Sequence, residues 1–99
     1  MSSGVQLSKN GAVTGTGASL NVTSVGFRPR RVTLFNSGGL ATSEWTDSMA
    51  DASALKRVTA GTLTFPLTLG ITPLANGFTI GADTDINVSG ELIHWVAFE

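Results

Sequence analysis

The 99-residue sequence contains no cysteine and few charged side chains. The absence of cysteine excludes a disulfide framework and a structural zinc site of the usual thiolate kind, and it is compatible with folding in a reducing cytoplasm. Only 13% of the residues are charged, against roughly 25% in most soluble domains, with six Lys and Arg against seven Asp and Glu. A surface so poor in charge favours a chain whose outside is largely covered by stable assembly.

The sequence also lacks the segments that direct a chain to a membrane or to nucleic acid. No apolar run approaches the roughly 18 residues of a membrane helix. The first residues, Met1 to Gly4, lack the charged region and following apolar run of a signal peptide. The largest basic cluster, Arg28, Arg30 and Arg31, is too small for the basic face of a nucleic-acid-binding domain. We therefore expect neither a membrane nor nucleic acid among the partners.

Helix signals are nearly absent, whereas turn residues and β-favouring residues alternate along the chain. Twelve glycines and three prolines interrupt the sequence every few residues, and Val, Thr and Phe fill the runs between them. This pattern is typical of an all-β fold, and the length suits one core but not two. We predict a single domain over residues 1–99, a small antiparallel β-sandwich or barrel of about eight short strands, with residues 1–8 as a candidate N-terminal tether.

Asn10-Gly11 is a strong hairpin signal, because a type I′ turn needs positive φ at both central residues. It predicts a hairpin that joins Val5–Leu7 to Ala12–Thr14. The segment between Gly70 and Gly77 is expected to be a surface loop. The other predicted strands are Ser19–Val22, Val32–Asn36, Thr42–Asp47 with Trp45 in the core, Ala54–Thr59, Thr62–Phe65, Phe78–Ile80 and Leu92–Phe98.

The last predicted strand is apolar on both of its faces. Successive side chains of a strand point to opposite sides of the sheet. One face carries Ile93, Trp95 and Ala97, and the other carries Leu92, Val96 and Phe98 with His94 between them. A strand of this kind needs a second buried surface, which a chain of this length obtains most simply from a partner chain.

No set of residues in the sequence assembles into an active site. His94 is the only histidine, and a catalytic triad would need a hydroxyl and a carboxylate brought to it from elsewhere. The favoured interpretation of His94 is a packed or interface residue. Gly15 and Gly17 lack the third glycine and the following helix of a dinucleotide-binding fingerprint. We expect no enzymatic activity and no cofactor.

Three polar residues at alternate positions, Asp83, Asp85 and Asn87, resemble the start of a calcium-binding loop. An EF-hand loop also needs Gly at its sixth place and Glu at its twelfth, and the sequence has Val88 and His94 there. The favoured interpretation is a turn in which these side chains bond to nearby amides. No metal is expected.

Four stretches of the sequence resemble small structural proteins of tailed bacteriophages. They are residues 26–32 (GFRPRRV), 44–49 (EWTDSM), 70–73 (GITP) and 77–98, which contains GFTIGADTDINV. The likeness extends over most of the chain from Gly15 onward and is to virion decoration proteins and fibre domains. It implies an all-β domain, often trimeric, that is made in the host cytoplasm and assembled on the virion.

Together these features predict a structural component of a bacteriophage virion. We expect a homo-oligomer, a trimer, that decorates the capsid or forms part of a fibre and contacts other virion proteins. Its subunits would bury apolar strand faces against one another, with charges at the rim setting the register. The predicted subunit-interface residues are Phe78, Ile93, Trp95, Phe98, Arg30 and Glu44.

The alternative hypothesis is a receptor- or carbohydrate-binding module at a fibre tip. Glu44 and Asp47 flank Trp45, and carboxylates beside an aromatic ring can bind or hydrolyse sugars. Solvent-facing strand carboxylates are nevertheless far commoner than sugar sites. The hypothesis assigns ligand contacts to Trp45 and Asp47, and it requires an exposed Trp45.

Overall fold

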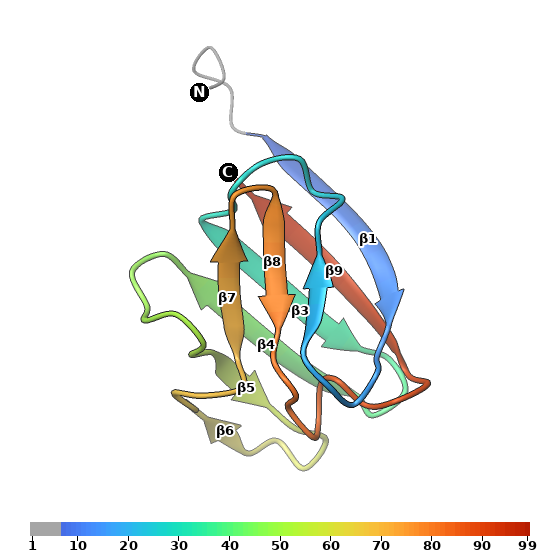
Figure 1. The fold of residues 1–99 in the computed structure, drawn as a ribbon. Helices are drawn as coiled ribbons and strands as arrows, with labels where there is room; N and C mark the ends of the chain where they lie inside the picture. Colours follow the sequence, from blue (N-terminus) through green and yellow to red (C-terminus); the bar gives the residue numbers. More distant parts are fainter. Residues whose placement is uncertain (1–6) are drawn as a thin grey trace.

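The computed structural model describes residues 7–99, which form nine strands in two antiparallel sheets packed face to face (Figure 1). One sheet has six strands in the order β1-β9-β3-β4-β5-β6, and the other has three in the order β2-β8-β7. Within residues 7–99 there is no helix, and the sheets do not close into a barrel. Of the two predicted all-β architectures, a sandwich and a barrel, the structure is therefore the sandwich. The strands are β1 Ser8–Thr14, β2 Leu20–Val22, β3 Arg31–Asn36, β4 Ala41–Thr46, β5 Leu55–Arg57, β6 Leu63–Thr64, β7 Ile71–Leu74, β8 Gly77–Ile80 and β9 Leu92–Phe98.

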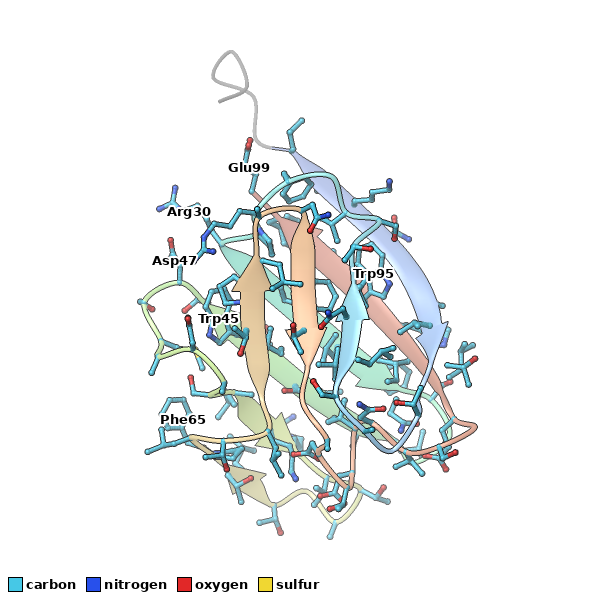
Figure 2. All side chains as sticks on the ribbon, in the orientation of Figure 1. Arg30, Trp45, Asp47, Phe65, Trp95 and Glu99 are labelled. Carbon is cyan, nitrogen blue, oxygen red and sulfur yellow. The ribbon has the colours of Figure 1, made fainter. Side chains whose placement is uncertain are left out.

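The core lies between the two sheets and contains both tryptophans (Figure 2). Trp45 of β4 is 1% exposed, which confirms its predicted place in the core, and its Nε1–H donates a hydrogen bond to the Ala50 carbonyl oxygen at 3.2 Å. Trp95 of β9 meets Phe78 of β8 edge-on, with ring centroids 5.6 Å apart. The Trp95–Phe78 contact therefore joins the six-stranded sheet to the three-stranded one.

The predicted hairpin at Asn10-Gly11 is wrong, because both residues lie inside β1. Gly11 pairs with Trp95 of β9, and a Cβ atom at Gly11 would lie 2.8 Å from the Trp95 ring. The glycine therefore makes room for the indole within the sheet and does not form a turn. Residues 5 and 6 of the predicted first strand, and residues 1–6 of the candidate tether, lie outside the described residues.

The prediction of a surface loop between Gly70 and Gly77 is also wrong, because this segment contains strand β7. Ile71 and Pro73 are buried, and β7 pairs with β8 through a tight hairpin. Proline has no N–H to donate to a ladder, but β7 is an edge strand of the small sheet, where this loss is tolerated. The other predicted strands coincide with observed strands apart from their end residues.

Strand β9 lies between β1 and β3 in the six-stranded sheet, as Figure 1 shows in red between blue and teal. Its residues alternate strictly, with Ile93, Trp95 and Ala97 buried in the core. Leu92 and Val96 point to the opposite side and are exposed. The predicted division of the strand into two apolar faces is therefore confirmed, and one of these faces is open in the single chain.

Candidate functional site

The side of the six-stranded sheet that faces away from the core, here called the outer face, carries several large exposed apolar side chains. Phe35 of β3 is 39% exposed, and it lies opposite His94 of β9 with their rings stacked at a centroid distance of 6.0 Å. The apolar members of the outer face are Phe35, Leu55, Leu63, Leu92 and Val96, each at least 36% exposed. Single exposed apolar residues are normal, but a group gathered on one face is typical of an interaction surface.

A shallow pocket of about 280 Å³ lies on the outer face between β3 and β6. Arg57 of β5 pairs with Thr42 of β4 on one side and with Leu63 of β6 on the other. Within residues 7–99, the exposed Arg57 guanidinium has no ion pair and no hydrogen bond. The pocket therefore contains a cation without a counter-ion of its own. The lining residues are Thr33, Thr42, Glu44, Leu55, Arg57 and Leu63.

The two charges predicted for the interface rim are paired within the chain. Arg30 Nε donates a hydrogen bond to Asp47 Oδ2 at 2.8 Å, and Figure 2 shows these side chains close together at one end of the sandwich. This hydrogen bond, together with the charge of Asp47, raises the pKa of Arg30 above its ordinary value. Arg31 Nη2 donates to Glu44 Oε1, also at 2.8 Å. Because the chain neutralises both Arg30 and Glu44 itself, neither needs a charge from a neighbouring subunit.

The other predicted interface residues divide between the core and the surface. Phe78, Ile93 and Trp95 are at most 4% exposed, so their side chains are packed inside the chain and do not reach a neighbour. Phe98 is half-buried at the end of the outer face, where the Arg31 guanidinium carbon lies 5.8 Å from its ring centroid. The predicted interface set therefore combines core residues of β8 and β9 with Phe98, which lies on the outer face.

The placement of Trp45 removes the basis of the carbohydrate-binding alternative. That hypothesis required an exposed ring, and Trp45 is buried between the sheets. Asp47 is exposed, but its carboxylate is paired with Arg30. The assignment of a ligand contact to Trp45 is therefore wrong, because alternation along β4 places its ring on the inner side.

The acidic bend after β8 is occupied by the side chain of Lys56 from β5. The Lys56 ammonium lies 3.1 and 3.0 Å from the two carboxylate oxygens of Asp83 and 2.6 Å from Asp85 Oδ2. Burial lowers the pKa of Lys56, but the hydrogen bonds to Asp85 and Asp83, and the charges of these carboxylates, outweigh it and raise the pKa. Asp83 Oδ1 also accepts hydrogen bonds from the N–H groups of Asp85 and Ile86, as expected for a turn.

Asn87 completes this bend by fixing it to the segment that precedes β2. Its Oδ1 accepts a hydrogen bond from the Thr16 N–H at 2.9 Å, and its Nδ2 donates to the carbonyl oxygens of Ala18 and Gly81. Within residues 7–99, no group of three or more His, Cys, Asp and Glu side chains is arranged to hold a metal ion. The bend is a structural link that joins both sheets.

His94 lies on the outer face. Its Nε2 is 3.2 Å from the Ser37 hydroxyl, and within residues 7–99 no carboxylate is hydrogen-bonded to the imidazole. A hydroxyl and an imidazole without this third group lack the member that orients the base in a catalytic triad. The surroundings of His94 are those of a surface residue beside Phe35.

Comparison with known proteins found no matching family model, no matching curated protein and no matching solved structure. Within the part of the chain that the structure describes, no helix is long and apolar enough to cross a membrane. The outer face and its pocket are therefore the features of the chain from which a function is inferred.

Proposed function

We propose that this chain is a structural component of a bacteriophage virion, a β-sandwich that assembles with copies of itself as a trimer. It decorates the capsid or forms part of a fibre, and it contacts other virion proteins. The observation that carries the proposal is the open apolar outer face of the six-stranded sheet. A location on the virion is supported by the resemblance to phage virion proteins of residues 26–32, 44–49, 70–73 and 77–98.

A subunit contact of ordinary size would cover a modest share of the surface of this chain. Specific interfaces bury roughly 800 Å² on each partner. The accessible surface of the chain is 5291 Å², so that an interface of this size covers about 15% of it. Permanent interfaces bury residues of the kind found in a domain core, and the outer face carries leucines, a valine and a phenylalanine among the polar residues Thr33, Thr42, Glu44, Arg57 and His94.

The proposal predicts an oligomer at micromolar concentration. Light scattering is expected to give about three times the 10.2 kDa of one chain. Phe35→Asp is expected to shift the protein to monomer, because it introduces a charge into the centre of the outer face, whereas Leu40→Asp, in the exposed β3–β4 turn, is the matched control and leaves the mass unchanged. A wild-type chain that remains monomeric would contradict the proposal.

A further inference from the structure

A loop at the side of the sandwich presents apolar side chains to solvent. Residues 65–69 connect β6 to β7, and Phe65, Leu67 and Leu69 are 53%, 64% and 51% exposed. Figure 2 shows Phe65 projecting away from the sheets at the margin of the molecule. These three residues follow Leu63 at alternate positions of the sequence, so exposed apolar residues continue beyond the short strand β6 into the bend at residues 67–70. We call residues 65–69 the apolar loop.

The apolar loop is held against the segment that carries Asp51. The Ala54 N–H donates to the Pro66 carbonyl oxygen, and the Gly70 N–H donates to the Ala52 carbonyl oxygen. Asp51 is exposed beside these contacts, and within residues 7–99 its carboxylate has no ion pair and no hydrogen bond. The loop and its neighbouring segment therefore combine apolar groups with one unneutralised negative charge.

Leu69 has a strained backbone conformation. Within one chain, packing of its exposed side chain does not offset this strain. Leu69 has φ of 61°, a conformation that costs an L-residue free energy and that glycine adopts readily. An exposed leucine gains little from packing in the isolated chain, so that glycine would be the less costly residue at this position. Leu40 in the β3–β4 turn shares this combination, so an external contact is assigned to Leu69 because it lies beside the exposed Phe65 and Leu67 in the apolar loop.

The pocket on the outer face has the complementary properties. Leu55 and Leu63 supply apolar walls, and Arg57 supplies a positive charge with no counter-ion of its own. Within residues 7–99, the charged side chains without a hydrogen bond or an ion pair are Arg28, Asp51 and Arg57. Two of these three, Asp51 and Arg57, lie beside exposed apolar groups, and their charges have opposite signs.

We propose that the apolar loop of one chain docks into the outer-face pocket of a second copy, with Asp51 of the first paired to Arg57 of the second. The inference rests on the proposed function, and it specifies which surfaces meet. Two different surfaces form the contact, so that it is heterologous, and a heterologous contact forms a ring when the rotation between neighbouring copies closes. A ring of three copies is the trimer of the proposed function. Each copy then uses its loop once and its pocket once.

Exchange of the two charges tests this pairing. Asp51→Arg and Arg57→Asp are each expected to weaken association about tenfold or more in sedimentation equilibrium, because each places like charges opposite one another. The double variant Asp51→Arg/Arg57→Asp restores the opposite signs, and we expect it to associate within about threefold of wild type. Arg28→Asp is the matched control, because Arg28 is also unpaired but lies outside the pocket, and it leaves association unchanged.

The outcomes separate this inference from the proposed function. Single variants that associate as tightly as an oligomeric wild type, or a double variant that is no tighter than the singles, overturn the Asp51–Arg57 docking and leave the assembly proposal standing. A wild type that is monomeric overturns both. Circular dichroism of each variant confirms that it is folded, which is expected because both side chains are exposed and unpaired within the chain.

Leu69→Gly provides a second test that does not involve charge. The variant relieves the positive φ at residue 69, so we expect an unchanged or higher melting temperature but association weakened about tenfold. Leu40→Gly is the matched control, because Leu40 has φ of 56° and is 58% exposed in the β3–β4 turn, away from the apolar loop. Leu40→Gly leaves association unchanged. Wild-type association of Leu69→Gly would overturn the docking of the loop.

Discussion

Trp45→Ala is expected to lower the free energy of unfolding by about 3–5 kcal/mol, a large part of the roughly 5–15 kcal/mol that stabilises a single domain. The substitution removes the largest fully buried side chain of the core and the hydrogen bond from Nε1 to Ala50. The strands on either side of β4 are fixed by their own ladders, which limits collapse around the cavity. Urea denaturation followed by circular dichroism measures the loss.

Leu40→Ala is the control for Trp45→Ala, because it also removes a large apolar side chain, but from a position that is 58% exposed and lies outside the apolar loop. Its effect on the free energy of unfolding is expected to stay within about 0.5 kcal/mol, as for most surface substitutions. If Trp45→Ala were as stable as wild type, Trp45 would not lie between the sheets, and the carbohydrate-binding hypothesis would have to be considered again.

Lys56→Met is expected to lower the free energy of unfolding by about 3 kcal/mol at neutral pH. This value is the lower part of the range for removing one partner of a buried ion pair. Methionine keeps the aliphatic part of the side chain but removes the ammonium. The Asp83 carboxylate, whose side chain is 10% exposed, then faces no cation, whereas Asp85 is 44% exposed and can be hydrated. Urea denaturation of wild type and variant gives the difference.

The same substitution in the Asp83→Asn/Asp85→Asn background is the matched control. Neutral amides need no cation, so that Lys56→Met is expected to cost much less there, and the difference between the two backgrounds is the coupling energy of the cluster. Equal costs in both backgrounds would show that Lys56 stabilises the fold only by packing.

The pH dependence of the Lys56→Met effect has a definite sign. The pKa of Lys56 is raised in the folded protein above its ordinary value of 10.5, so the stabilisation from the ammonium is fully present below pH 10.5. It is lost as the pH rises above 10.5 through the folded value. The gap between wild type and Lys56→Met is therefore expected to be constant around neutral pH and, as the pH rises from there, to shrink in this alkaline range. A gap that already closes near about pH 9 would indicate a lowered pKa.

The sequence predicted most strands because alternation and turn residues are local signals. In β3, the spacing of Val32, Leu34 and Asn36 indicated one shared face, and all three are buried. In β9, the two faces were correctly separated, and Trp95 and Ile93 lie on the same side. The strand order β1-β9-β3-β4-β5-β6 could not be derived in this way, because it depends on which distant segments pair.

The errors at Gly11 and Pro73 arose because both residues serve a distant neighbour. Glycine after asparagine has the local signature of a turn, but in β1 the glycine accommodates the Trp95 ring across the sheet. Proline ordinarily interrupts a strand, but at the edge of the small sheet its missing N–H costs no ladder bond. Neither circumstance is visible in a short window of sequence.

The candidate site was the part least accessible to sequence reasoning. Alternation in β3 places Asn36 on the face of Val32 and Leu34 and Phe35 on the other face, but it does not say which of the two faces is covered. Asn36 is buried because its Nδ2 donates to the Ile86 carbonyl oxygen and its Oδ1 accepts from the N–H groups of Gly38 and Gly39. These contacts leave Phe35 on the outer face, and Phe35 was not among the predicted interface residues.

The central position of β9 determines when the six-stranded sheet can form. Ribosomes make residues 92–98 after every other strand, yet β1 and β3 both pair with them, so the six-stranded sheet cannot be completed on a nascent chain that still lacks them. Sandwiches dominated by such distant pairings fold in roughly milliseconds to seconds. Because β9 also contributes Leu92 and Val96 to the outer face, that surface exists only once the sheet has formed. Subunits are thus protected from associating through this surface until β9 has joined the sheet.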